Sequence, residues 1–548
     1  MGYWIKFLGD ERRRERTMLF VLLTTVCLVY LPFLGNPFVF DDLSFFKSGL
    51  PAHYVATLAQ LELRGLPYAS LGWTVAIFSD VVPHFFHLGN LLLHATNVVL
   101  LFLLLRRLLR VQLLPDAVNV STVEWGAWLG ALVFACHPVA VYAVGYVVER
   151  SILLATLFSL LAQWAYLRGL LEGQKRWLIL TVAAYFLACF SKEHSVMLPA
   201  VLVAQTVLLR GKMVLDRQKL GLVWAAFLVI ALFWLWRVSG GLAKPYEAMA
   251  PALFAQQGLA QSNAVLHGLS VLTQAGLFFK YLLLWFVPNP AWMSVDMREP
   301  FLGGLLSWQS WFGMGAFAAY GMLGGWLLLR PRWQSLLGWA LLYPWLQFMV
   351  EFSVVRVQEP FVLYRSYLWM PGMMMIFPLL LVHFPGRKTM FGLFGIVALL
   401  VPLAWNRLIT FSDDYRLWDD AAVLLRNDTV PGADRIFYNR AQALVAKHQW
   451  EEAIVDFKRT VVISPQLAPV RYALGMVYVN AGHYPEAIEQ FDVELAIKQN
   501  EARGYFGKGL ALMGLHQKDA ALVQMQRGCE LGNDMACAMA SWSQPKKE

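Results

Sequence analysis

Charged side chains are scarce in this sequence. Asp, Glu, Lys and Arg make up 15% of its 548 residues, whereas hydrophobic residues make up 58%. Soluble domains carry about a quarter charged residues, so this composition excludes an ordinary soluble domain and predicts a polytopic membrane protein. The net charge of +9 is typical of basic cytoplasmic loops. We therefore expect no nucleic-acid partner.

Cysteine is also scarce, and the five cysteines show no metal-binding spacing. Cys27, Cys136 and Cys189 lie in or beside apolar runs. Cys529 and Cys537 lie close together near the C-terminus, where a disulfide would need an extracytoplasmic location.

The sequence lacks a P-loop, a dinucleotide-binding fingerprint and a serine nucleophile elbow. Any donor substrate is therefore expected to be something other than a soluble nucleotide in a Rossmann-like site.

Long apolar runs dominate what is present. The first follows a basic N-terminus without a small-residue cleavage site after it, which predicts an uncleaved anchor. Runs of this length predict about eleven or twelve membrane spans. They lie at 18–34, 86–105, 125–144, 150–168, 176–191, 195–210, 219–236, 311–330, 335–350, 366–383 and 389–407, with a twelfth segment at 264–287 that Lys280 interrupts.

Basic residues predict the orientation of these spans. Arginines at 12–16 precede the first span, which places the N-terminus in the cytoplasm. Every later basic cluster also falls inside if 264–287 is interfacial or re-entrant, and the same parity puts everything after Arg407 outside. We expect a protein of the inner (cytoplasmic) membrane. The later clusters are "RRLLR" (106–110), "RGLLEGQKR" (168–176), "RGKMVLDRQK" (210–219), "RPR" (330–332) and "GRK" (386–388).

The C-terminal part repeats itself with a period of 34 residues. Ala441, Gly475 and Gly509 coincide, and three further columns align in the same way. Small residues let paired helices approach, which is typical of tetratricopeptide repeats. We expect a membrane domain at 1–410 and a periplasmic repeat domain at 411–548, with repeats at about 434–467, 468–501 and 502–535. Its concave face is expected to bind a protein; the alternative is a rigid spacer or an oligomer contact.

The predicted fold class is therefore all-α: a polytopic membrane helix bundle followed by a tetratricopeptide repeat solenoid. In this topology, five polar segments share the external face. Such convergence is required of an active site at a membrane surface, although every external loop must be polar somewhere. The segments are the loop after the first span, 145–149, 191–194, 237–310 and 351–365.

The first external loop reads "NPFVFDDLSFF" (36–46) and contains adjacent carboxylates, Asp41 and Asp42. They can cap a helix or solvate the loop. Partial desolvation by the flanking phenylalanines would instead raise a carboxylate pKa and favour a general base. Two carboxylates can also hold a divalent cation, but a complete oxygen-ligand set is not visible. A metal is therefore not required, and no cofactor is assigned.

The other external turns supply further candidate residues. His84 and His87 lie near the mouth of the second span, where helix packing is the alternative role. Glu149 and Arg150 can pair with each other or face the pocket. Lys192, Glu193 and His194 form a charged turn in which Lys192 suits a lipid phosphate. Arg365 and Tyr367 head a later span, and Arg365 suits phosphate or an interfacial aromatic belt. Lys280 is a weaker pocket candidate.

The order of these motifs resembles the transmembrane and tetratricopeptide repeat-containing protein family and its bacterial relatives, of the C-type glycosyltransferase (GT-C) superfamily. The resemblance covers about 18–540. It is carried by the acidic pair, "HLGNLLLHATN", "ALVFACHPVAVYAVGYVVERSILLATLF", "SKEHSVMLPAVLV", "YRSYLWMPG" and the repeats.

The resemblance implies a polyprenyl-phosphate-linked sugar donor and transfer at the external face. Asp41 would be the principal catalytic carboxylate, and Arg365 would lie near the donor phosphate. The other matched positions are Asp42, Glu149, Arg150, Lys192, Glu193 and Tyr367.

The resulting hypothesis is an inverting membrane glycosyltransferase. Asp41 deprotonates a Ser or Thr hydroxyl of an exported protein, such as a pilin, while Arg365 and Lys192 hold the leaving lipid phosphate. The repeats bind the protein acceptor, and membrane lipid and the lipid-linked sugar are the other partners. The alternatives are a glycan or lipid acceptor, or a non-catalytic membrane assembly scaffold.

Overall fold

The chain is all-helical in the computed structural model, which confirms the predicted fold class. The structure describes residues 11–78, 80–114, 118–245, 262–301, 308–428, 430–465 and 467–542. Within these ranges the β-structure is limited to one isolated bridge between Pro245 and Val355. The chain divides into two compact units, Met1–Val295 with Phe301–Asp413 and Asp296–Pro300 with Asp414–Glu548.

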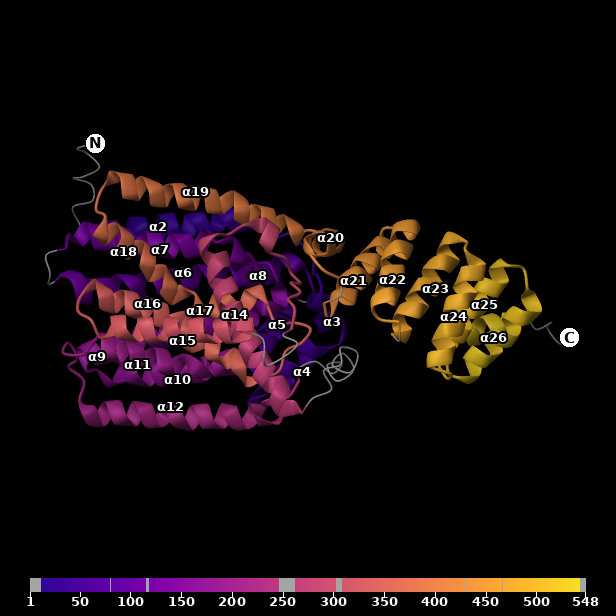
Figure 1. Cartoon of the computed structure of the whole chain (residues 1–548), viewed down its shortest axis with the longest axis horizontal. Helices are drawn as coiled ribbons and strands as arrows, with labels where there is room; N and C mark the ends of the chain where they lie inside the picture. The colour runs from indigo at the N-terminus through magenta and orange to yellow at the C-terminus, as the bar shows by residue number, and fades with distance from the viewer. Residues whose placement is uncertain are drawn as a thin grey trace. The chain divides into compact units, whose positions relative to one another are not determined.

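The first unit is a bundle of apolar helices, and its long helices lie alongside one another (Figure 1). Its α-helices are α2 (Glu11–Tyr30), α3 (Asp41–Lys47), α4 (Leu50–Ala56), α5 (Gly65–Phe78), α6 (Pro83–Leu113), α7 (Val120–Cys136), α8 (Val141–Val144), α9 (Arg150–Glu172), α10 (Lys175–Ser191), α11 (Leu198–Leu208), α12 (Arg217–Val238), α14 (Asn263–Phe286), α15 (Trp308–Leu328), α16 (Trp333–Phe348), α17 (Ser366–Trp369), α18 (Ile376–His383) and α19 (Arg387–Thr410). Short 3₁₀ helices join many of them: η1 (Leu31–Phe33), η2 (Leu58–Gln60), η4 (Pro138–Ala140), η5 (Val147–Glu149), η6 (Glu193–Met197), η7 (Ser239–Gly241), η8 (Pro290–Trp292), η9 (Met349–Ser353), η10 (Leu363–Arg365) and η11 (Pro371–Met375).

Six helices in the described ranges are long and apolar enough to cross a membrane, or up to eight if each of two bent pairs is one span. This is fewer than the eleven or twelve spans that the apolar runs predicted. The difference arises because several runs fold into shorter helices: α10 has 17 residues, α16 has 16 and α11 has 11. At 1.5 Å per residue, these helices reach roughly 17–26 Å, short of a hydrocarbon core of about 30 Å.

Polar side chains on α6 hold the neighbouring helices of the bundle. His94 Nδ1 lies 2.6 Å from Tyr367 Oη on α17, and Asn97 Nδ2 donates to the Leu153 carbonyl of α9 at 3.0 Å. Small residues let other helices approach closely: a Cβ on Gly130 would lie 2.8 Å from the Met374 carbonyl oxygen. These contacts favour helix packing for this part of α6.

The segment at 264–287 forms the continuous helix α14, so Lys280 does not interrupt it. Near the start of α14, His267 Nε2 lies 2.7 Å from the Phe352 carbonyl oxygen in η9. Near its end, the Trp285 carbonyl oxygen lies 3.0 Å from Nε2 of His137, just after α7. Because α14 is long and apolar enough to cross a membrane, an interfacial or re-entrant position for this segment stays a prediction.

The second unit is a series of helix pairs that follow one another along the chain (Figure 1). Its helices are α20 (Asp414–Leu424), α21 (Ala433–Ala446), α22 (Trp450–Ile463), α23 (Ala468–Ala481), α24 (Tyr484–Ile497), α25 (Ala502–Gly514), α26 (Lys518–Glu530) and α27 (Asp534–Trp542). The repeating small residues lie at close approaches: a Cβ on Gly475 would lie 2.7 Å from the Phe491 ring. Ala453, Ala487 and Ala521 are fully buried in the same repeat column. Cys529 and Cys537 form a disulfide.

Candidate functional site

The two aspartates of the first external loop have different environments. They begin α3, directly after Phe40, whose φ of 52° is in the left-handed region that non-glycine residues rarely adopt. The Asp42 side chain is fully buried, and its Oδ1 accepts the Val148 amide at 2.7 Å. Asp41 is exposed. Asp42 therefore joins the loop to residues 147–148, while Asp41 is the accessible carboxylate.

Burial raises the pKa of Asp42 from 3.8 to about 8, although its hydrogen bonds from backbone amides, chiefly Val148, act to lower it. Desolvation disfavours the charged carboxylate more than these amides stabilise it. The raised pKa that we expected from the surrounding apolar residues is thus found at Asp42. Because Asp42 is buried, it holds the loop in position and is not accessible as a catalytic base.

Tyr146 links the acidic pair to the turn before α9. The Asp41 backbone amide donates to Tyr146 Oη at 3.1 Å, and the rings of Phe40 and Tyr146 stack with their centroids 6.0 Å apart. The Tyr146 ring also lies 6.4 Å from the Tyr364 ring. Three segments that are far apart in the sequence therefore meet beside Asp41.

Lys192 pairs with Glu149 next to this aromatic group. Lys192 Nζ lies 2.8 Å from Glu149 Oε2, donates to Ser151 Oγ at 3.1 Å and lies 4.9 Å from the centre of the Tyr364 ring. Both Lys192 and Glu149 are buried. The pairing brings the start of α9 and the turn after α10 into one site.

Arg150 is held by neutral acceptors. Its guanidinium donates to Asn90 Oδ1 at 2.9 Å, to Thr74 Oγ1 at 3.1 Å and to the Phe86 carbonyl at 2.9 Å. These contacts join α5, α6 and α9. Arg150 is 4% exposed. It therefore holds the helices that carry the site together and does not face the solvent.

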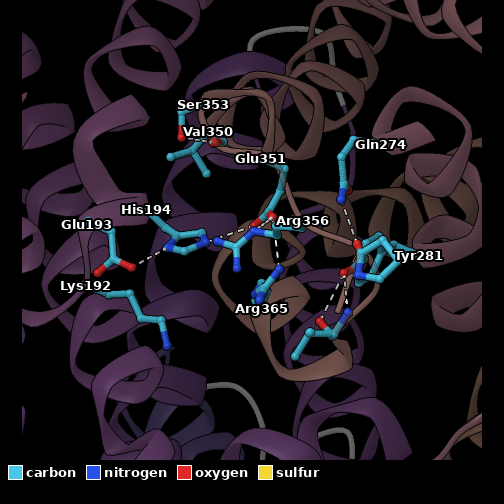
Figure 2. Close-up of polar contacts among 12 residues, drawn as sticks. Lys192, Glu193, His194, Gln274, Tyr281, Val350, Glu351, Ser353, Arg356 and Arg365 are labelled. Carbon is cyan, nitrogen blue, oxygen red and sulfur yellow. Dashed lines mark hydrogen bonds and ion pairs between the residues drawn. The ribbon is translucent and has the colours of Figure 1, made fainter. Parts of the chain in front are cut away.

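A chain of ionic contacts, the Glu351 network, extends from the partly exposed Glu193 to the buried Arg365. Arg64 Nε donates to Glu193 Oε2 at 3.0 Å, and His194 Nδ1 lies 3.6 Å from Glu193 Oε1. The next step is shown in Figure 2: His194 Nε2 lies 2.9 Å from Glu351 Oε1, and Arg365 Nη1 lies 3.1 Å from Glu351 Oε2. The network comprises Arg64, Glu193, His194, Glu351, Arg356 and Arg365.

Glu351 is the central residue of this network, although no sequence motif points to it. Its side chain is fully buried, with Arg356 Nε 3.3 Å from Oε2. Burial alone would raise the pKa of Glu351, but the Arg365 and Arg356 guanidiniums outweigh this effect and hold the pKa well below its usual range. The one sequence feature that could have indicated Glu351 is the polar stretch 351–365, which contains Glu351, Arg356 and Arg365.

The remaining predicted residues lie at the margins of the site. His87 Nε2 lies 3.0 Å from the Asn36 carbonyl oxygen, which places it under the acidic loop, whereas His84 is exposed. Lys280 lies on α14 with Nζ 4.8 Å from the centre of the Phe361 ring. Tyr367 points into the bundle, toward His94, and so does not accompany Arg365.

Metal ligands do not converge in the described ranges: no group of three or more His, Cys, Asp or Glu side chains there is arranged to hold an ion. The divalent cation considered for Asp41 and Asp42 therefore gains no further ligand from these residues.

Comparisons with known proteins found no matching family model and no matching curated protein. Among solved structures, the chain is similar to YrrB, described as a TPR protein with an unusual peptide-binding site, at 17% identity and a TM-score of 0.23, over 30% of this chain and 89% of that one. It is also similar to MamA at 23% identity and a TM-score of 0.20, over 29% and 85%.

A third similar structure is the APC/C hetero-tetramer Cut9-Hcn1, at 13% identity and a TM-score of 0.23, over 78% of this chain and 85% of that one. All these scores and identities are low. The repeat architecture of the second unit therefore rests on its own 34-residue period and helix pairs.

Proposed function

We propose that this protein is a membrane glycosyltransferase that moves a sugar from a polyprenyl-phosphate-linked donor to a Ser or Thr hydroxyl of an exported protein. One observation supports this most: the exposed Asp41 is linked through the rings of Tyr146 and Tyr364 to the buried cation Lys192. Lys192 and Arg365 are the cations best suited to bind the donor phosphate. Each has a carboxylate partner and still retains further N–H donors.

The proposed reaction is a single inverting displacement. The Asp41 carboxylate takes the proton of the acceptor hydroxyl, whose oxygen then forms a bond to the anomeric carbon of the sugar. The bond from that carbon to the phosphate oxygen breaks, and the electron pair leaves with the polyprenyl phosphate. A general base of this kind contributes roughly 10²–10⁴-fold to the rate.

Lys192 and Arg365 are proposed to stabilise the charge of the departing phosphate. The Lys192 ammonium has three N–H donors, of which Glu149 and Ser151 engage two. Arg365 donates to Glu351 through Nη1. Glu149 and Glu351 hold these cations in place before the donor binds, so the site needs little reorganisation when charge develops.

The test compares exported proteins from cells that lack the gene with cells complemented by wild type, Asp41→Asn or Lys47→Gln. Intact mass spectrometry measures glycosylation. We expect Asp41→Asn to be correctly folded and to lower transfer by roughly 10²–10⁴-fold. Lys47 is an exposed residue of the same helix, so Lys47→Gln is the matched control and should retain transfer.

Glycan masses that stay the same on all exported proteins after gene deletion would refute protein glycosylation. The same deletion then separates the alternatives, because a glycan or lipid acceptor would change lipid-linked or surface glycans instead.

A second candidate is a membrane assembly scaffold, which the repeat unit favours. Three helix pairs, α21–α22, α23–α24 and α25–α26, form a short solenoid of the kind that binds peptides or proteins. A scaffold should keep its activity in Asp41→Asn, whereas the proposed enzyme should lose turnover and remain folded.

A further inference from the structure

A cavity lined by arginines lies between α6 and α9, away from the site described above. Its volume is 190 Å³. We call it the arginine pocket, and the residues used here are Arg106, Arg107, Arg110, Trp164, Arg168 and Glu172.

The arginine pocket lies at the opposite end of the bundle from Asp41. On α6, Arg107 follows His87 by twenty residues, which is about 30 Å of helix. On α9, Arg168 follows Arg150 by eighteen residues, or about 27 Å. Since a bilayer hydrocarbon core is about 30 Å thick, a membrane whose one surface is at Asp41 would have the headgroups of its other leaflet at the level of the pocket.

Most of the positive charge in the pocket is already compensated. Arg106 pairs with Glu15 at 2.7 Å and with Glu124 at 2.6 Å, and Arg110 also pairs with Glu124. Arg168 pairs with Glu172 at 2.8 Å.

Arg107 is the exception. It is exposed, and it is attracted by Glu172, whose carboxylate already pairs with Arg168. The carboxylates hold the other guanidiniums in fixed positions, and Arg107 leaves the group with an excess positive charge. This arrangement is suited to receive one anion.

The pocket is also amphipathic. Trp164 forms part of its wall, and the Arg168 guanidinium lies 5.1 Å from the Trp164 ring and 4.0 Å from the Trp177 ring. Tryptophan is enriched where protein meets lipid headgroups. A volume of 190 Å³ is below the range of roughly 300–1,000 Å³ that holds a whole drug-sized ligand. It suits a headgroup whose acyl chains stay in the bilayer.

We infer that the arginine pocket binds a phosphate group, supplied by an anionic membrane lipid or by a free phosphate. Basic pockets between membrane helices bind such headgroups through charge-assisted hydrogen bonds. The inference is independent of the proposed transfer reaction, because it uses none of the residues around Asp41.

The test uses the purified full chain in neutral detergent. Its thermal unfolding midpoint is followed by tryptophan fluorescence while phosphatidylglycerol, phosphatidylcholine or inorganic phosphate is added. A ligand that binds the folded state raises the midpoint in a saturable way. We expect this response to phosphatidylglycerol, and a much weaker one to phosphatidylcholine, in which choline neutralises the phosphate.

Three variants identify the site. Arg107→Gln should weaken the apparent affinity roughly tenfold, as expected for one hydrogen bond to a charged group, and Arg107→Lys should retain most of the response. Arg217→Gln removes an exposed arginine at the start of α12, outside the pocket, and should bind as wild type does.

An equal response to inorganic phosphate, with the same dependence on Arg107, would identify a free phosphate as the ligand. A wild-type protein with no saturable response to either source would overturn the inference, and so would equal effects of Arg107→Gln and Arg217→Gln.

Discussion

Asp41 and Asp42 are adjacent in the sequence but have different physical roles. Asp42 is buried against the backbone of residues 147–148, where its carboxylate accepts the Val148 amide. This contact fixes the start of α3 and so places Asp41 beside Tyr146. The strained φ of Phe40, 52°, is maintained in the same loop, and strain of this kind costs roughly 1–3 kcal/mol. The surrounding packing therefore has to determine where Asp41 lies.

The buried Asp42 should make the stability of the protein depend on pH. Its pKa is about 8 in the folded chain, so the folded state keeps a proton that the unfolded state has lost above about pH 4. The contribution of Asp42 to the free energy of unfolding should therefore fall as pH rises between about 4 and 8, by up to ~1.4 kcal/mol per pH unit. We expect the thermal unfolding midpoint of wild type, measured relative to that of Asp42→Asn, to fall across this range.

Asp42→Asn isolates this effect, because other titrating groups are common to both proteins. The difference between the wild-type and Asp42→Asn midpoints should vary with pH in this window. Asp41→Asn is the matched control and should follow wild type. A pH-independent difference for Asp42→Asn would show that Asp42 titrates normally.

Glu351 connects three segments of the membrane unit that are far apart or separated by loops in the sequence. It lies in η9 and contacts His194 of η6, Arg365 of η10 and Arg356 of the intervening loop. All four side chains are buried. The position of Arg365, and hence of the proposed phosphate contact, therefore depends on one carboxylate.

Replacing Glu351 with Gln should strongly destabilise the membrane unit. The change removes the carboxylate that the buried Arg365 and Arg356 guanidiniums both contact, and breaking a buried ion pair in this way costs roughly 3–5 kcal/mol. A lower thermal unfolding midpoint of the purified chain measures the effect. Glu351→Gln combined with Arg365→Gln should recover part of the loss.

The matched control for this prediction is Glu62→Gln. Glu62 pairs with His53 at 3.2 Å in an exposed position, and exposed pairs contribute roughly 0–1 kcal/mol. Similar losses in Glu351→Gln and Glu62→Gln would contradict the central role of Glu351.

The sequence predicts elements well where the determining contacts are local. The 34-residue period predicts the helix pairs of the second unit because each repeat packs mainly on its neighbours. The pairing of His194 with Glu351 spans 157 residues, so no periodicity predicts it. Tyr367 lies two residues beyond Arg365, and residues two apart on a helix do not share a face. This is why Tyr367 points into the bundle.

At the scale of the whole molecule, the membrane unit is asymmetric between its two ends. One end carries the Glu351 network, in which cations and carboxylates are paired and four of the six side chains are buried. The other end carries the arginine pocket and, on α6, the cluster 106–110. Basic residues favour the cytoplasmic side of a membrane. The network end is therefore expected to be extracytoplasmic, and the eleven spans that the apolar runs predict would place the repeat unit on the same side.

The Cys529–Cys537 disulfide provides a test of this sidedness. Disulfides persist in oxidising compartments and are rare in the cytoplasm. Cys27, Cys136 and Cys189 are free thiols. Cells are quenched in acid, and the thiols of the denatured chain are alkylated with a maleimide and counted by intact mass. We expect three adducts without reduction, for the three free cysteines, and five after reduction, for all five.

Cys537→Ser is the control for this count, because it frees Cys529 and should give four adducts in both conditions, one fewer than the five cysteines of wild type. Five adducts on the wild-type chain without reduction would mean that the pair is reduced in the cell. The repeat unit would then be on the cytoplasmic side, where it cannot bind an exported acceptor, and the proposed transfer to such a protein would fail with it.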